Sequence, residues 1–254
     1  MLIKKILDTA QPQLKGKSVT DLVIGLSLIA CQLDTGEVGV SYVLRDNLPN
    51  GCSAFAFAQE VTGKSASEVA QLAVTGKNDI QRSVATSVLV AASQGQDIPN
   101  DDGDMPFGVP FKPDDTVGMI GMIVPVAKQL EPMVGKMIVF DRGLEQCGGH
   151  PMLSPMAEQE KLLPTCDVVL LSGTTTINGS IDSLLGMCAS AREVVLVGPS
   201  SPMYTQAFAG SAVTRVAGSW WKNDEKDAIF KAVSLGGGIR QVSPYMIKKT
   251  APVK

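Results

Sequence analysis

The spacing of apolar residues changes near the middle of the chain and divides it into two parts. In the first part, Ile3, Ile6 and Leu7 share one face of a predicted helix, which Pro12 is expected to kink or end. Apolar runs over residues 22–33 and 37–44 predict two strands, and the turn between them contains Gly36, which can take a positive φ.

Two further helices are predicted downstream. Ser65 and Glu68 form a capping-box pattern at the start of the first. The second follows Asp79 as its N-cap, carries apolar residues at i, i+4 and i+8, and is stopped by Gly95. The first part is therefore predicted to be a small antiparallel sheet with helices on one face.

The second part alternates short apolar strands with helical segments. The predicted strands cover residues 116–121, 136–140, 167–172, 193–198 and 212–218. A last helix is expected to open at Asn223 and to close at Gly236–Gly238. Alternating strands and helices indicate an α/β fold, a Rossmann-like doubly wound parallel sheet, preceded by a smaller α+β domain.

A proline-rich, acidic segment separates the two parts. It contains Pro99, Pro106, Pro110 and Pro113, which suit neither a continuous helix nor a central strand. We therefore expect domains over residues 1–98 and 115–254, joined by a linker over 99–114.

Composition narrows the function. The formal charge is −3 and no basic stripe is present, so nucleic acid is a poor candidate partner. The first residues do not resemble a secretory signal, and no apolar segment approaches the roughly 20 residues of a membrane span. Five cysteines without a secretion signal indicate reduced thiols, so we expect a cytoplasmic protein with no membrane partner.

The best functional signal is the chemistry at the predicted strand ends. Doubly wound sheets bind ligands beyond the carboxyl ends of their strands, where the chain order reverses. Most residues there are small or carry hydroxyl groups, which allow close approach and hydrogen bonding. The predicted ligand-binding residues are Gly118, Gly121, Asp141, Ser172, Gly173, Thr174, Thr175, Asn178, Gly198, Pro199, Ser200 and Ser201.

Each of these motifs has a plain structural alternative. Gly118 and Gly121 form only part of a dinucleotide fingerprint, and Asp141 lies where such folds keep a ribose-binding acid. This favours a nucleoside ligand such as S-adenosylmethionine, unless the glycines serve packing and Asp141 caps a loop. The loop 172–180 is suited to an anion, or Asn178 or Ser180 simply caps a helix. The segment 198–202 is otherwise a turn made rigid by proline.

Cys147 and His150, the only histidine, form a C-x-x-H pair in a glycine-containing loop. They are candidate ligands for a divalent metal, but a zinc site needs three or four protein donors, so others would have to come from elsewhere. The alternative is a flexible loop over the ligand site. Cys31, Cys166 and Cys188 fall in apolar contexts typical of a core, whereas Cys52 is predicted to be exposed.

Four stretches carry a resemblance to a known family: "TVGMIG", "LLPTCDVVLLSGTTTINGSIDSLL", "REVVLVGPSSPM" and "VAGSWWKND". Their order and spacing over most of residues 114–227 resemble the putative heavy-metal chelation family. The resemblance implies an N-terminal domain like that of enolase, a Rossmann-like domain similar to methyltransferases, and a cleft between them. It also implies metal chelation, or the making of metal-binding, pterin-like or flavin-like molecules, with no reaction established.

By motif, the resemblance carries over to Gly121, Ser172–Thr175, Asn178 and Gly198–Ser201. The helix before the linker departs from the family pattern, which has a Gly and an Asn-Ala pair where this chain reads "VATSVLVAAS". The C-x-x-H pair is not part of that pattern.

Three functions remain open on the sequence. The first is an enzyme acting on a small metabolite, with Asp46, Asp79 and Asp141 as candidate acids by location. The second is a non-catalytic protein that binds or delivers a metal or a metal chelate, and the third is a structural or regulatory subunit. Trp220 and Trp221 indicate packing or a subunit interface, and hence a possible homodimer.

Overall fold

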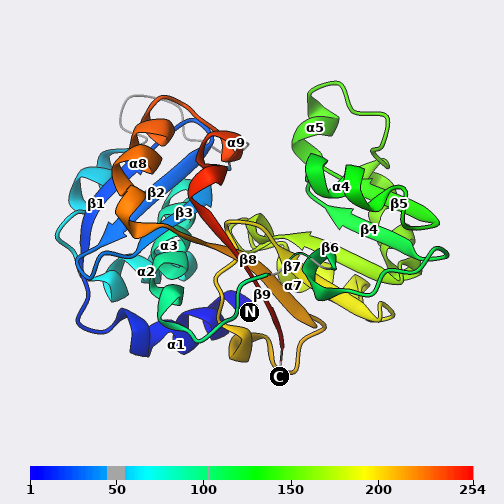
Figure 1. Cartoon of the computed structure of the whole chain (residues 1–254), viewed down its shortest axis with the longest axis horizontal. Coiled ribbons are helices and arrows are strands. Elements are labelled where there is room, and N and C mark those ends of the chain that lie inside the picture. The colour runs from blue at the N-terminus through cyan, green and yellow to red at the C-terminus, as the bar shows by residue number, and fades with distance from the viewer. Residues whose placement is uncertain (45–54, 102, 104, 254) are drawn as a thin grey trace.

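The computed structural model describes residues 1–44, 55–101, 103 and 105–253, which form two lobes (Figure 1). The first lobe is built on a three-stranded sheet in the order β1-β2-β3, and the second on a six-stranded sheet in the order β5-β4-β6-β7-β8-β9. This is the mixed α/β class that the two spacings of apolar residues predict.

The first lobe starts with α1 (Leu2–Leu14), which continues past Pro12 because this proline lies in its exposed last turn. The strands β1 (Val19–Ile24), β2 (Leu28–Leu33) and β3 (Val38–Tyr42) pair antiparallel. The apolar run 22–33 is therefore a hairpin and not one strand. Gly25 lies in its turn, where a Cβ would approach the Val233 carbonyl oxygen to 2.3 Å.

Helices cover both faces of this sheet. The helix α3 (Asp79–Ala92) packs on β2 and β3, and α2 (Ala66–Thr75) packs against α3. The opposite face is covered by α8 (Lys226–Ser234) from the second half of the chain, which contacts β1 and β2. The prediction of helices on one face is therefore wrong. Burial on both faces explains why β2 is apolar at every position except Gln32 instead of alternating.

The helix starts follow the expected capping chemistry with one shift. Ser65 Oγ accepts a hydrogen bond from the Glu68 amide at 3.1 Å, as the capping-box pattern predicts. The N-cap of α3 is Asn78, whose Oδ1 accepts from the Gln81 amide at 3.0 Å, so Asp79 is the first helical residue and not the cap. The helix ends at Ala92 and a 3-10 turn, Ser93–Gly95, follows.

The second lobe contains the five expected parallel strands: β4 (Thr116–Ile120), β5 (Lys136–Phe140), β6 (Val168–Ser172), β7 (Glu193–Val197) and β8 (Arg215–Trp221). The chain order reverses at β4, because β5 lies on one side of it and β6 on the other. The helices α4 (Val124–Leu130), α5 (Arg142–Gln146), α6 (Gln159–Leu162) and α7 (Ile181–Met187) lie in the connections from β4 to β7, whereas a 3-10 turn, Thr205–Phe208, lies between β7 and β8.

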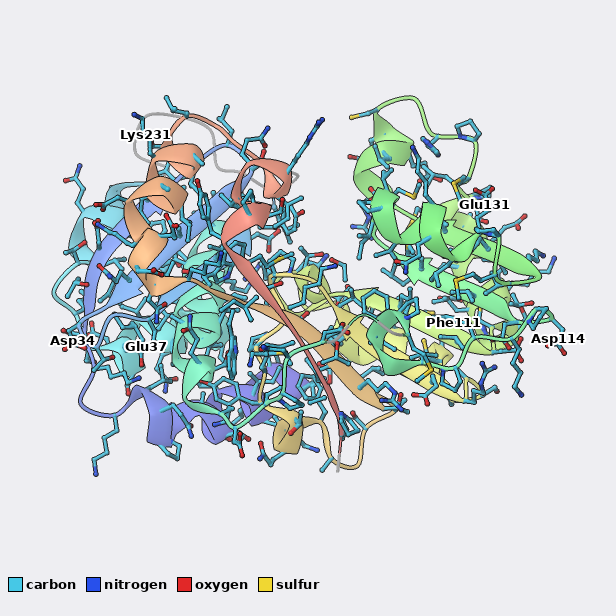
Figure 2. The ribbon with its side chains drawn as sticks, viewed as in Figure 1. Asp34, Glu37, Phe111, Asp114, Glu131 and Lys231 are labelled. Atoms are coloured by element: carbon cyan, nitrogen blue, oxygen red, sulfur yellow. The ribbon has the colours of Figure 1, made fainter. Side chains whose placement is uncertain are left out.

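The end of the chain passes back and forth between the lobes (Figure 1). After β8 it enters the first lobe as α8 and α9 (Ile239–Val242), then returns as β9 (Met246–Pro252), antiparallel to β8. Figure 2 shows Lys231 of α8 on the same side of the molecule as Asp34 and Glu37, and Glu131 on the other. The lobes are thus joined by three chain passages, the first of which is the segment between α3 and β4.

Polar contacts reinforce this connection. The Lys249 ammonium lies 3.9 Å from the centroid of the Trp220 ring and donates to the Ile98 carbonyl at 2.7 Å, while burial lowers its pKa. Trp220 Nε1 donates to Ser93 Oγ at 3.2 Å. Both tryptophans lie within β8 and not after it. None of the helices in the described ranges is both long and apolar enough to cross a bilayer.

Candidate functional site

The register of the parallel strands brings three loop tips together. Ile120 pairs with Leu171, and Ser172 pairs with Val197, so the residues that follow β4, β6 and β7 are neighbours at one edge of the sheet. A Cβ on Gly121 would lie 3.0 Å from the Ser172 Cβ. We call the half-buried residues at this edge the strand-end rim: Gly121, Asp141, Ser172, Thr174 and Gly198.

Two glycines of the rim have backbone conformations that other residues rarely adopt. Gly121 has φ +84° and donates its amide to the Phe140 carbonyl at 2.8 Å. Gly198 has φ +111°, and a Cβ there would meet no atom within 4 Å. Gly198 therefore leaves main chain at the rim without side-chain cover, as close approach of a ligand requires, whereas the Ser172 side chain lies against the Cβ position of Gly121.

Asp141 joins the loops that follow β4 and β5. Its Oδ2 accepts from the Met122 amide at 2.8 Å, and its Oδ1 accepts from the Leu144 amide at 2.9 Å as the N-cap of α5. The sequence alternative that Asp141 caps a loop is thus present in the structure. Each oxygen keeps a second lone pair, so contact with a ligand stays a prediction.

The loop after β6 divides its hydroxyl groups between the interior and the rim. The hydroxyls of Thr175 and Thr176 donate to carbonyls of their own turn at 2.7 Å each, and both side chains are buried. Ser172 Oγ and Thr174 Oγ1 lie 2.9 Å apart and are half-buried. Asn178 Oδ1 accepts from the amide and hydroxyl of Ser180, so Asn178 forms a turn just before α7, whose N-cap residue is Ser180 without a side-chain capping bond.

The loop after β7 packs closely against the loop after β6. A Cβ on Gly173 would lie 2.6 Å from Ser201 Oγ, so only glycine fits there. Pro199, Ser200 and Ser201 are buried. Ser200 Oγ accepts from the Tyr42 amide of the first lobe at 2.8 Å, and Ser201 Oγ has no hydrogen-bond partner among the described residues.

Gly118 has a different place from the one predicted. It lies in the middle of β4 and not at its end, and a Cβ there would approach Cys166 Sγ to 2.9 Å. Its role is packing between the sheet and the segment that contains Cys166.

The C-x-x-H loop is exposed at both residues. His150 Nδ1 accepts from the Met152 amide at 3.3 Å, which leaves Nε2 as its remaining donor to a metal. Over the described ranges, no three His, Cys, Asp or Glu side chains gather in a way that could hold a metal ion. The structure thus supplies Cys147 and His150 with no further such ligand from the described chain, and their binding of metal stays a prediction. Asp46 and Cys52 lie outside the described residues.

The other described cysteines are buried, as their apolar contexts predict. Burial raises the pKa of the Cys31, Cys166 and Cys188 thiols to about 12, 11 and 12. Thiols with such raised pKa values stay protonated at neutral pH, so their burial is typical of core residues and does not favour a nucleophilic role.

One residue close to the rim is not singled out by sequence reasoning. Arg82 of α3 donates from Nε to the Ile177 carbonyl at 2.7 Å and from Nη1 to the Gly76 carbonyl at 2.8 Å, and it forms an ion pair with Asp79. The available signal was a lone arginine in a helix that is otherwise apolar or small after its first turn.

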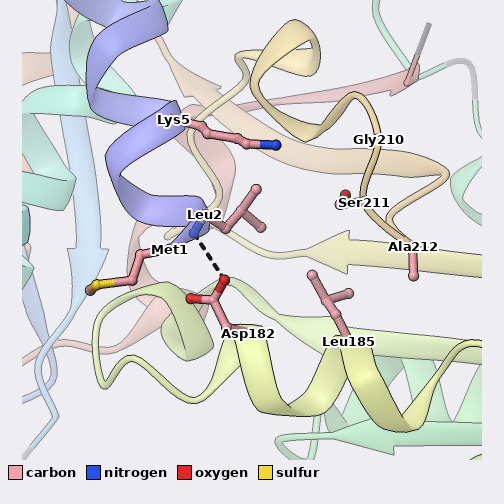
Figure 3. A pocket seen from close by; sticks show the side chains of 8 residues that line it. All are labelled: Met1, Leu2, Lys5, Asp182, Leu185, Gly210, Ser211 and Ala212. Atoms are coloured by element: carbon pink, nitrogen blue, oxygen red, sulfur yellow. Dashed lines mark hydrogen bonds between the residues drawn. The ribbon is translucent and has the colours of Figure 1, made fainter.

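Two open surface hollows lie away from the rim. One, of about 280 Å³, lies between the start of α1, α7 and residues 210–212, and there the Leu2 amide donates to Asp182 at 3.0 Å (Figure 3). The other, of about 460 Å³, lies beside β5 and is lined by residues 131, 134–137 and 151–154.

The fold places the chain among two-lobed α/β proteins with a mostly parallel sheet that reverses at β4. Residues 105–252 match a family model described as putative heavy-metal chelation, and residues 7–93 match a second model with the same description. The chain belongs to this putative heavy-metal chelation family, as its motifs predict.

Solved structures support the fold. A protein of unknown function from Pyrococcus horikoshii is 19% identical, with a TM-score of 0.78 over 100% of both chains. Another, from Desulfitobacterium hafniense, is 18% identical, with a TM-score of 0.76 over 98% of both chains.

An uncharacterised protein from Methanocaldococcus jannaschii is 28% identical over 102 residues, which span 40% of this chain and 39% of that relative.

Proposed function

We propose that this protein binds a small metabolite or metal chelate at the strand-end rim. The observation that carries the proposal is the contact between Gly121 and Ser172 at the point where the chain order reverses. The open main chain at Gly198 lies at the same sheet edge as the hydroxyl pair of Ser172 and Thr174.

The chemistry of the rim favours an organic ligand that carries the metal over a bare ion. Hydroxyl groups such as those of Ser172 and Thr174 form hydrogen bonds to the oxygen and nitrogen atoms of siderophore-like, pterin-like or flavin-like molecules. Soft metals prefer thiolate ligands and borderline metals such as zinc also bind imidazole, and the rim carries neither group. The small molecule would thus coordinate the metal, and the protein would recognise the small molecule.

The site is proposed to face the first lobe. Tyr42 and Arg82 of that lobe each form a hydrogen bond to a loop at this edge of the sheet. A ligand on the rim would then lie in a cleft between the lobes.

A second candidate is a nucleoside ligand such as S-adenosylmethionine. Asp141 favours it, because this acid follows β5 next to the reversal point and keeps free lone pairs. A third is direct metal delivery through Cys147 and His150, which are exposed. The three candidates differ in which molecule stabilises the fold.

Thermal unfolding with four additives tests the proposal: iron(III)–citrate, citrate alone, S-adenosylmethionine and Zn²⁺. At a hundredfold excess over Kd, binding adds about 2.7 kcal/mol, or roughly 5–10 °C in Tm. We expect iron(III)–citrate to raise Tm and Thr174→Val to remove most of that rise.

Thr165→Val is the matched control, because it also removes one hydroxyl hydrogen bond, the one to the Leu162 carbonyl, but at a position away from the rim. An equal rise in Thr174→Val and wild type would contradict the proposed place of the site. A rise with Zn²⁺ alone, lost in His150→Ala, would favour direct metal binding instead.

A further inference from the structure

The loops at the sheet edge are held in two different ways. Within the second lobe, Asp141 ties the loop after β4 to the loop after β5. The loops after β6 and β7 are instead tied to the first lobe, through Arg82 to Ile177 and through the Tyr42 amide to Ser200.

Arg82 connects three parts of the chain with one planar group. Its guanidinium reaches the end of α2 at Gly76, the first turn of α3 at Asp79, and the loop of the second lobe at Ile177. The side chain is 28% exposed and its acidic partner 4%. Hydrogen bonds from a charged donor with so little water around them are among the stronger ones in proteins.

No other side chain replaces this arrangement. Lysine carries its three donors on one nitrogen and cannot place them along a rigid fork toward separate acceptors. Inside the loop, the hydroxyls of Thr175 and Thr176 bond only to their own turn, so they fix its shape but not its position relative to the first lobe.

We propose that the first lobe positions the ligand loops of the second, with Arg82 as the positioning residue for residues 173–178 and Tyr42 as the anchor for Ser200. The inference rests on the proposed function of the strand-end rim. It implies that loss of the Arg82 contact weakens ligand binding although Arg82 does not touch the ligand.

The chain offers a closely matched control. Arg192 pairs with Asp115 through two hydrogen bonds of 2.6 Å and donates to the Pro110 carbonyl at 3.1 Å. Its side chain is 32% exposed and its acidic partner 3%, almost as for Arg82. Arg192→Lys therefore removes a similar clamp that does not reach the ligand loops.

The first measurement is amide hydrogen exchange without any added molecule. The Ile177 and Asn178 amides, which donate to the Thr174 carbonyl, report on the loop. We expect Arg82→Lys to speed their exchange roughly ten- to hundredfold, the factor that one charge-assisted hydrogen bond supplies. Arg192→Lys should leave them unchanged, and Ser200→Ala should speed exchange over residues 198–201.

The second measurement is the affinity for iron(III)–citrate by calorimetry. A weaker affinity in Arg82→Lys, with wild-type affinity in Arg192→Lys, supports the inference. Unchanged exchange at residues 177 and 178 overturns it whatever binds to the rim. If Arg82→Lys does not fold, unchanged exchange over residues 198–201 in Ser200→Ala overturns it instead. Faster exchange with unchanged affinity overturns the proposed place of the loop in the ligand site.

Discussion

Replacing Asp141 by alanine tests its structural role at the strand-end rim. The change removes the acceptor for two amides, those of Met122 and Leu144. Loss of an N-cap costs about 0.5–2 kcal/mol, and loss of a hydrogen bond to a charged group about 1.5–3 kcal/mol. Because Asp141 is half-buried, water replaces part of both bonds. We therefore expect a loss of about 2 kcal/mol, or roughly 4–8 °C in Tm.

The assay is urea unfolding followed by far-UV circular dichroism. Asp141→Asn keeps one acceptor oxygen and should lose about half as much stability. Asp182→Ala is the control, since Asp182 also accepts one amide, that of Leu2, but is exposed and lies away from the rim. Wild-type stability in Asp141→Ala would refute the argument that this carboxylate holds the two loops together.

Three further outcomes are expected. Gly39→Ala should lower the free energy of unfolding by about 3 kcal/mol or more, because its Cβ would lie 1.9 Å from the Ser87 carbonyl oxygen; the urea midpoint measures this. Hydrogen bonds from Arg192 hold the pKa of Asp115 below its ordinary value. The carboxylate therefore stabilises the fold above about pH 4, and this stabilisation is lost as the pH falls through the lowered pKa. Between pH 6 and pH 3, the urea midpoint should thus fall less in Asp115→Asn than in the wild type. In a Cys52→Ser background, iodoacetamide at pH 8 should modify only Cys147 in the native protein, because Cys147 is exposed and the other remaining cysteines are buried. Rapid modification of Cys31 would contradict its burial.

The alternation of elements in the second lobe could be predicted because parallel strands buried on both faces are short and uniformly apolar. The same uniformity hid the hairpin at Gly25, where residues 22–33 read as one apolar run. β9 escaped prediction because Lys248, Lys249 and Pro252 are atypical of a strand, yet Lys249 is buried by Trp220.

The partner of α8 could not be read from its sequence. An amphipathic pattern shows which face of a helix is buried, but not which sheet buries it. The alternation of strands and helices in the second half of the chain placed α8 on the six-stranded sheet, whereas it packs on the three-stranded sheet. Likewise, the positions of Ser172 and Thr174 followed from strand ends, whereas the roles of Arg82 and Asp141 depend on contacts between distant segments.

The passage of the chain through α8 has a consequence for biosynthesis. Leu28, Ala30, Val38 and Val40 on the outer face of the first sheet lack the cover of α8 until residues 226–234 exist. During synthesis on the ribosome, this apolar face of the N-terminal sheet therefore stays exposed to solvent until most of the chain has been made.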